Sequence, residues 1–149
     1  AGLVSFLLAH IAYLIGFNLT PPPLNLAAAV LVVLVAPVGV RLYRRIAAGL
    51  DASGRSRLKT PVLIYSIVIS LMLISALLTL VRPNSDWPTW AALAASAGAL
   101  LFFLSDSFLA WNKFVEPLPY GKLRVHFTYH LGQILIVTGA VLHYLGRAG

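Results

Sequence analysis

The sequence predicts an all-α fold, a polytopic transmembrane helical bundle with five spanning helices. Hydrophobic residues make up 60% of the 149 residues, charged residues make up 10%, and the mean hydropathy is +0.90. A soluble domain carries about 25% charged residues, so this chain has too little polar surface to cover a soluble fold. The apolar residues also fall into runs close to the roughly 20 residues that cross a bilayer. We therefore expect a single transmembrane domain over residues 1–149.

The first two predicted spans are joined by a proline-rich turn. Residues 1–19 contain no Asp, Glu, Lys or Arg, which makes them the first span. The segment Thr20-Pro-Pro-Pro23 ends this run, because proline cannot continue a helix. Residues 24–40 form a shorter second span, which ends at Arg41.

A basic connection separates the second span from the third. Residues 41–59 contain six Lys or Arg residues and one acidic residue. Gly49 and Gly54 are typical helix breakers, so we expect a polar loop here. The third span covers residues 60–81 and places Pro61 in its first turn, where the missing N–H of proline removes no hydrogen bond.

The last two predicted spans are residues 90–114 and 125–145. Small residues recur every four positions along the fourth span, at Ala91, Ala95 and Ala99. Such spacing lets a neighbouring helix approach closely in a membrane. We expect this ridge to be a packing surface rather than a site of chemistry.

The charges of the connections predict an orientation. Residues 41–59 hold six Lys or Arg residues and residues 113–124 hold three, whereas the opposite side has Arg82 and Arg147. Cytoplasmic loops of membrane proteins carry an excess of Lys and Arg. We therefore expect a multi-pass protein with loops 41–59 and 113–124 in the cytoplasm. The same rule accounts for the net charge of +7 without a nucleic-acid partner.

Asp106 is the one acidic residue inside a predicted span. An ionisable group at the bilayer centre costs roughly 2.5 kcal/mol or more and is usually kept for a function. At a rise of 1.5 Å per residue, Asp106 lies about 10 Å below Lys113. Other polar residues are predicted in the same half of the bilayer, and we expect them to share one cavity open to the cytoplasmic leaflet: His10, Tyr65, Tyr129, His130 and Gln133.

Simpler interpretations of these residues exist. A buried Tyr, Ser or Gln often only hydrogen-bonds a neighbouring helix, and Asp106 could be the structural partner of a His or Tyr. His126 and His130 have the i,i+4 spacing of metal ligands, but two ligands do not close a zinc site and the chain has no cysteine. We therefore expect no metal, no cofactor and no disulfide.

Four blocks of the sequence resemble the YhhN-type lysoplasmalogenases, polytopic membrane enzymes that hydrolyse the vinyl ether bond of lysoplasmalogens. The blocks follow the family's order along nearly the whole chain. They are Phe6-x-x-x-His10-x-x-Tyr13, Pro61-Val62-x-x-Tyr65, Ser105-Asp106 within residues 98–114, and Thr128-Tyr129-x-x-x-Gln133.

The resemblance implies a hydrolase that releases a fatty aldehyde and a glycerophospho-base. Vinyl ethers hydrolyse by slow proton transfer to carbon, and water then traps the oxocarbenium ion. Burial of a carboxyl favours its neutral form, which makes Asp106 the expected general acid. The other expected catalytic residues are His10, Tyr129 and Gln133, and the expected substrate-binding residues are Tyr13, Tyr65, Ser105, His130, Arg41 and Arg124.

The chain begins at the first of these blocks, and the family's upstream Gly-Asp motif is missing from it. We therefore expect an amino-terminally truncated member, the carboxyl-terminal part of a larger family domain. The expected partner is a lysophospholipid in the membrane, and the sequence leaves oligomer formation open. Two other functions remain as alternatives. One is a small proton- or ion-coupled transporter module that uses Asp106, and the other is a non-catalytic membrane assembly subunit.

Overall fold

The computed structural model describes residues 2–82 and 87–146. It contains five α-helices and one short 3₁₀ turn, and the described residues include no strand, so the predicted all-α fold is confirmed. Arg147, which entered the charge count above, lies outside the described residues. The elements are α1 (Gly2–Phe17), α2 (Leu26–Ala52), η1 (Ser56–Leu58), α3 (Lys59–Leu78), α4 (Thr89–Phe114) and α5 (Gly121–Leu145).

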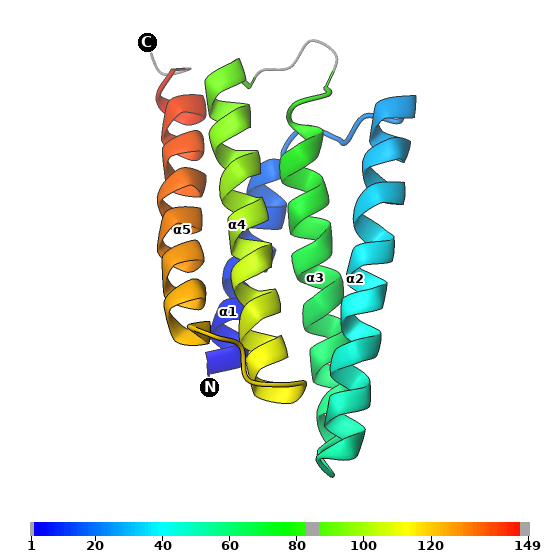
Figure 1. Cartoon of the computed structure of the whole chain (residues 1–149). Helices are drawn as coiled ribbons and strands as arrows, with labels where there is room; N and C mark the ends of the chain where they lie inside the picture. Colours follow the sequence, from blue (N-terminus) through cyan, green and yellow to red (C-terminus); the bar gives the residue numbers. More distant parts are fainter. Residues whose placement is uncertain (1, 83–86, 147–149) are drawn as a thin grey trace.

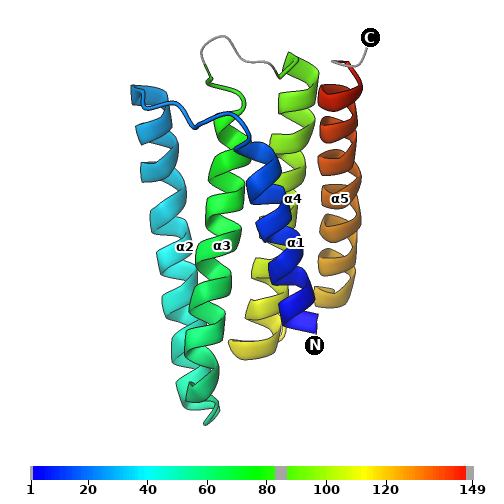
Figure 2. The ribbon, with the colours of Figure 1, turned by 180° about the vertical axis from the view of Figure 1, so that it is seen from behind.

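Helices α2, α3, α4 and α5 lie side by side in that order, and α1 packs behind them (Figure 1). Seen from behind, α1 lies between α3 and α5 and crosses α4 (Figure 2). The α2–α3 and α4–α5 connections lie at the same end of the bundle as the start of α1. We call this the basic end, after the residues that it carries: Arg44, Arg45, Arg55, Arg57, Lys59, Lys113, Lys122 and Arg124.

Four of the five predicted spans are confirmed as helices long and apolar enough to cross a membrane. They are α2, η1 with α3, α4 and α5. The first predicted span, residues 1–19, is a helix of 16 residues. At 1.5 Å per residue this helix is about 24 Å long, shorter than a hydrocarbon core of about 30 Å. The count of five spans is therefore one more than the described residues show.

The helix starts follow local sequence signals. Helix α2 begins at Leu26 because the side chain of Asn25 accepts a hydrogen bond of 2.8 Å from the backbone N–H of Ala28. Pro61 lies in the first turn of α3, as predicted. Helix α5 begins four residues earlier than predicted, at Gly121, directly after Tyr120 with its positive φ of 54°.

The predicted polar loop at residues 41–59 is wrong as far as Ala52, because α2 continues through it. The residues there are mostly good helix formers. Two apolar side chains one turn apart, Ile46 and Leu50, are buried inside the protein and hold this extension. The length of α2, 27 residues, is about 40 Å and exceeds the hydrocarbon core.

The two glycines predicted to break this segment behave differently. A Cβ at Gly49 would lie 1.8 Å from the carbonyl oxygen of Phe114, so this glycine lets α2 touch the end of α4. Gly54 does end the segment, with φ at +67°, a conformation that glycine adopts at no steric cost.

Helices α4 and α5 approach each other backbone to backbone. A Cβ at Gly98 would lie 2.7 Å from the carbonyl oxygen of Gly132, and a Cβ at Gly139 would lie 2.7 Å from that of Ala91. Ala91 and Ala95 are fully buried there. The predicted close packing of the small-residue ridge is therefore confirmed. We call this contact the α4–α5 seam, formed by Ala91, Ala95, Gly98, Gly132 and Gly139.

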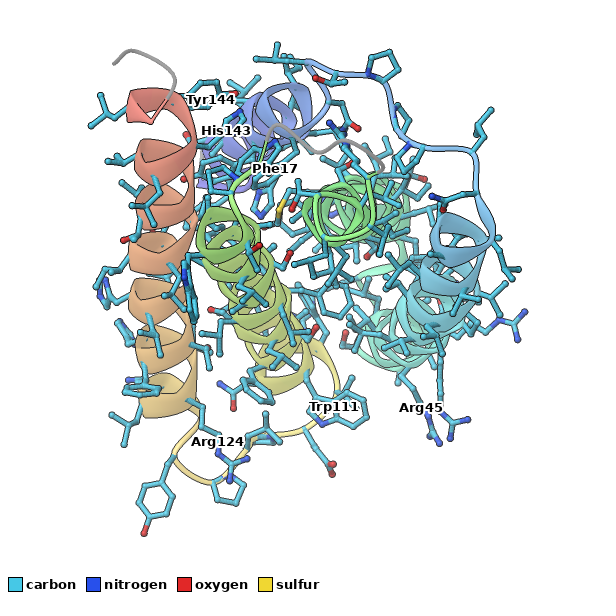
Figure 3. The ribbon with its side chains drawn as sticks, turned by 90° about the horizontal axis from the view of Figure 1, so that it is seen from above. Phe17, Arg45, Trp111, Arg124, His143 and Tyr144 are labelled. Carbon is cyan, nitrogen blue, oxygen red and sulfur yellow. The ribbon has the colours of Figure 1, made fainter. Side chains whose placement is uncertain are left out.

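Aromatic side chains close the end of the bundle opposite the basic end. The rings of Trp87 and His143 stack with centroids 3.9 Å apart. Phe17 at the end of α1 lies 5.8 Å from Trp87, and the hydroxyl of Tyr144 donates to the carbonyl of Gly16 at 3.1 Å. These contacts hold the end of α1 against α5, where Figure 3 shows Phe17, His143 and Tyr144 gathered.

Candidate functional site

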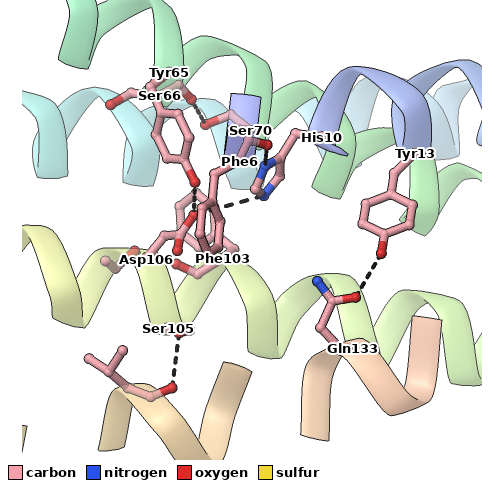
Figure 4. A network of polar contacts seen from close by, with 12 residues as sticks. Phe6, His10, Tyr13, Tyr65, Ser66, Ser70, Phe103, Ser105, Asp106 and Gln133 are labelled. Atoms are coloured by element: carbon pink, nitrogen blue, oxygen red, sulfur yellow. Dashed lines mark hydrogen bonds and ion pairs between the residues drawn. The ribbon is translucent and has the colours of Figure 1, made fainter. Parts of the chain in front are cut away.

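Asp106 is the point at which three helices meet. It lies on α4, and 9% of the residue is exposed. The hydroxyl of Tyr65, on α3, donates a hydrogen bond to its Oδ2 atom. The Nε2 atom of His10, on α1, lies 3.8 Å from the same oxygen, beyond hydrogen-bond distance. We call Asp106, Tyr65 and His10 the carboxylate cluster (Figure 4).

His10 has a fixed orientation in this cluster. The residue is fully buried, and its Nδ1 atom lies 2.6 Å from the carbonyl oxygen of Phe6. A carbonyl oxygen only accepts hydrogen bonds, so Nδ1 carries a proton. In the neutral ring the lone pair is then on Nε2, which faces Asp106 and has no hydrogen-bond partner among the described residues. The ring of Phe102 packs against His10 edge to face, with centroids 4.7 Å apart.

A cavity of about 470 Å³ adjoins the cluster. Residues of α2, η1, α3 and α4 line it, together with Phe6 of α1. Asp106 and Tyr65 face this cavity, whereas His10 is not among its lining residues. The wall is mostly apolar, and its remaining polar or charged side chains are Ser66, Ser70, Ser107 and Lys113. The site therefore presents one carboxyl and one phenol to a space suited to a hydrocarbon chain.

The three serines and Lys113 were not selected as site residues from the sequence. The hydroxyl of Ser66 donates to the carbonyl of Val62 at 2.8 Å, and that of Ser70 donates to the carbonyl of Ser66 at 2.7 Å. Each donor is therefore satisfied within α3, as is usual for serine in a membrane helix. Two features of the sequence could have indicated that these serines line the site: the i,i+4 spacing of Ser66 and Ser70, and the position of Ser107 next to Asp106.

Tyr13 and Gln133 form a second polar contact, separate from the cluster. The hydroxyl of Tyr13 donates to Oε1 of Gln133 at 2.7 Å and links α1 to α5 (Figure 4). Tyr129, one turn away on α5, packs its ring 5.8 Å from Phe6 and 5.4 Å from Phe102. None of Tyr13, Tyr129 and Gln133 is among the lining residues of the cavity. The polar residues expected in one cavity are thus not together, since Tyr129 and Gln133 lie apart from the carboxylate cluster.

The remaining predicted site residues lie elsewhere. The hydroxyl of Ser105 donates to the carbonyl of Val125 at 3.1 Å, so this side chain faces α5 (Figure 4). His130, Arg124 and Arg41 are exposed. None of these four candidates is among the lining residues of the cavity.

His126 and His130 lie on the exposed side of α5, with ring centroids 6.3 Å apart. The Nδ1 atom of His126 lies 2.7 Å from the carbonyl oxygen of Lys122, so the ring is held against its own helix. Within residues 2–82 and 87–146, no group of three or more His, Cys, Asp or Glu residues is arranged to hold a metal ion.

Known proteins resemble the chain along most of its length. The lysoplasmalogenase TMEM86B of Sus scrofa is 32% identical over 139 residues, which cover 91% of this chain and 50% of the relative. The lysoplasmalogenase TMEM86A of Bos taurus is 31% identical over 141 residues, which cover 94% of this chain and 54% of the relative. The chain thus spans about half the length of these curated relatives. No solved structure matches it. The sequence model of the YhhN family matches residues 1–140, and the chain therefore belongs to the YhhN family.

Proposed function

We propose that the carboxylate cluster hydrolyses the vinyl ether bond of lysoplasmalogens and releases a fatty aldehyde and a glycerophospho-base. The observation that carries this proposal is the position of Asp106, a nearly buried carboxyl that faces an apolar cavity. The relatives named above are lysoplasmalogenases, so a transporter module or a non-catalytic subunit is not favoured. In this proposal the alkenyl chain of the lipid lies in the cavity and its vinyl ether lies against Asp106.

Proton transfer to carbon is the difficult step of this reaction. Because Tyr65 occupies Oδ2, protonated Asp106 donates from Oδ1 to the vinyl carbon that bears no oxygen. The product is an oxocarbenium ion, which the newly formed carboxylate stabilises. Water adds to the cationic carbon and returns a proton to Asp106. The resulting hemiacetal breaks its bond to the glycerol oxygen, giving the aldehyde and the free glycerol hydroxyl.

In this proposal, the other predicted catalytic residues either position Asp106 or hold the helices in place. Tyr65 orients the carboxyl by its hydrogen bond, and His10 acts as a positioning residue, since it contacts the carboxyl without lining the cavity. Gln133 holds α1 in place through Tyr13, and Tyr129 does so through its ring contact with Phe6.

The test is fatty-aldehyde release from a lysoplasmalogen by the purified 149-residue chain in detergent. A lysolipid with a saturated ether is the control substrate. The chain is assayed alone and after coexpression with the remaining part of a full-length relative, because it spans about half of such a relative. Replacement of Asp106 by Asn should lower the rate by at least about 100-fold, the typical contribution of a general acid.

Asp51→Asn is the matched control, because Asp51 is an exposed residue that pairs with Lys59 at the basic end. This variant should keep the wild-type rate, since surface ion pairs contribute little. A wild-type rate in Asp106→Asn would remove Asp106 from the mechanism. Absence of aldehyde from both forms of the wild-type chain would overturn the proposed hydrolysis.

We also propose that the basic end faces the cytoplasm, because the positive-inside rule places Lys- and Arg-rich connections there. The chain has no cysteine, so single cysteines can report the orientation. Ala52 lies at the basic end and Leu24 lies in the connection at the opposite end, and both are exposed. A membrane-impermeant thiol reagent on intact cells should label Leu24→Cys and spare Ala52→Cys. The reverse pattern would contradict the orientation.

A further inference from the structure

A second cavity, of about 360 Å³, lies at the basic end, between the end of α2 and the connection that follows α4. It shares two lining residues with the first cavity, Lys113 and Phe114. The two cavities are therefore neighbours across these residues. The second one has a different character, because charged and polar side chains line much of it: Ser53, Arg55, Asn112, Lys113 and Glu116.

Two cations gather around one aromatic ring in this cavity. The guanidinium carbon of Arg55 lies 5.2 Å from the ring centroid of Phe114, and Nζ of Lys113 lies 5.5 Å from it. Arg55 is also held by hydrogen bonds from Nε to Oγ of Ser53, at 3.0 Å, and from Nη2 to the carbonyl of Lys113, at 3.4 Å. Neither cation forms an ion pair with a carboxylate in the described part of the chain. Two positive charges are thus held around the ring of Phe114.

A carboxylate lies on the same cavity. Glu116 accepts a hydrogen bond of 3.4 Å from Nε1 of Trp111 and is exposed. Two cations and one anion around a polar cavity complement a group that carries a phosphate and an amine. The planar fork of arginine suits the phosphate oxygens, and lysine adds a second positive charge.

The spacing fits a lipid that occupies both cavities. Lys113 follows Asp106 by seven residues on α4, which corresponds to about 10 Å along the helix. Five covalent bonds separate the ether oxygen of a lysolipid from its phosphorus, a reach of about 6 Å at ordinary bond lengths of about 1.5 Å. The side chains of Asp106 and Lys113 extend toward the lipid and span the remaining distance of about 4 Å between the helix spacing and the reach of the lipid. An ether held at Asp106 therefore brings its phosphate to the residues that both cavities share.

We propose that the second cavity is the head-group site for a lysophospholipid whose chain lies in the first cavity. Arg55 and Lys113 bind the phosphate, and Glu116 binds the ammonium of the head group. This inference rests on the proposed function, because it gives a binding site to the head group of the same lipid substrate.

The test measures binding rather than turnover. The probe is a saturated-ether lysophosphocholine, which the proposed reaction does not cleave, and its affinity for the purified chain is measured by titration in detergent. The neutral glycerol ether with the same alkyl chain is the reference ligand. Arg55→Gln and Lys113→Gln should each weaken binding of the phosphocholine lipid at least about tenfold, as expected for a lost charged hydrogen bond. Binding of the neutral ether should stay unchanged.

Arg57→Gln is the matched control, because Arg57 lies two residues from Arg55, is exposed and does not line the cavity. Glu116→Gln should weaken binding of the phosphocholine lipid but should leave unchanged the binding of a lysolipid that carries a phosphate without an ammonium group. Equal losses for the neutral ether, or for Arg57→Gln, would overturn the head-group site. Equal affinity for glycerophosphocholine without an alkyl chain would also overturn it, in favour of a site for a soluble phosphate ester. A chain that binds the probe selectively but releases no aldehyde, either alone or after coexpression with the remaining part of a relative, keeps this inference and loses the proposed hydrolysis.

Discussion

The two faces of α4 are built in opposite ways. Toward α5, glycines and alanines bring the two backbones into contact, and the seam has no room for another carbon atom at Gly98. Toward α2 and α3, the same helix leaves a cavity of about 470 Å³ and places Asp106 beside it. One helix therefore supplies both the rigid contact of the bundle and the wall of the candidate site.

The difference shows how a membrane bundle can tolerate a cavity next to a carboxyl. Lipid chains are as apolar as the helices, so helix association in a bilayer depends on close van der Waals contact and on hydrogen bonds. The α4–α5 seam provides that contact over several turns. The face toward α2 and α3 borders the cavity, and hydrogen bonds from Tyr65 to Asp106 and from Ser96 to the carbonyl of Ala76 join α3 to α4 there. Changes on the two faces should therefore have different consequences.

The largest expected effect comes from adding one methyl group to the seam. In Gly98→Ala, the new Cβ would meet backbone atoms of Gly132 and Ile136 at 2.7 and 2.6 Å, and these atoms cannot move aside without shifting α5. We expect a loss of roughly 1–3 kcal/mol of unfolding free energy, typical of overpacking. Unfolding of the purified protein in detergent, followed by circular dichroism, measures it.

Gly39→Ala makes the same change on α2, in the wall of the cavity that the second face of α4 borders. Its Cβ would meet Oγ of Ser70 at 2.8 Å, which is the end of a side chain that can rotate. The unfolding free energy should stay within about 0.5 kcal/mol of wild type. Equal stability losses in the two variants would remove the proposed difference between the faces.

A smaller effect is expected from Tyr65→Phe, which changes a side chain of α3 in the wall of the cavity. The substitution keeps the ring and removes the hydrogen bond to Asp106, so the stability should fall by about 1 kcal/mol. Aldehyde release should fall roughly tenfold, because the carboxyl loses its orientation. Tyr43→Phe serves as the control, since the structure gives Tyr43 no hydrogen bond or ring contact. Wild-type turnover in Tyr65→Phe would show that the orientation of Asp106 does not depend on this bond.

The smallest effect is expected from Tyr13→Phe, which removes the hydrogen bond to Gln133 between α1 and α5. Interhelical hydrogen bonds in membranes contribute about 0.6 kcal/mol on average. A double-mutant cycle with Gln133→Leu should give a coupling energy of this size, with turnover within about twofold of wild type. A loss of turnover as large as that of Tyr65→Phe would instead place this pair in the catalytic site.

Much of the fold could be predicted from the sequence. The apolar runs predicted the positions of all five α-helices, because a run of apolar residues can be recognised from the local sequence alone. The spacing of Ala91 and Ala95 predicted the face of α4 that packs closely, since residues four apart share one side of a helix. The extension of α2 to Ala52 was missed, because its arginines suggested a loop while tertiary contacts of Ile46 and Leu50 decide that it stays helical.

The sequence alone determined that this is an apolar helical bundle with one carboxyl, Asp106, inside a span. Both properties depend on which residues follow one another along the chain. Only the tertiary structure decided that Tyr65 and His10 reach Asp106, while Gln133 pairs with Tyr13 instead. Those partners depend on the rotation of each helix about its axis and on the distances between helices. Periodicity gives the face on which a residue lies, but the packing of neighbouring helices determines what that face meets.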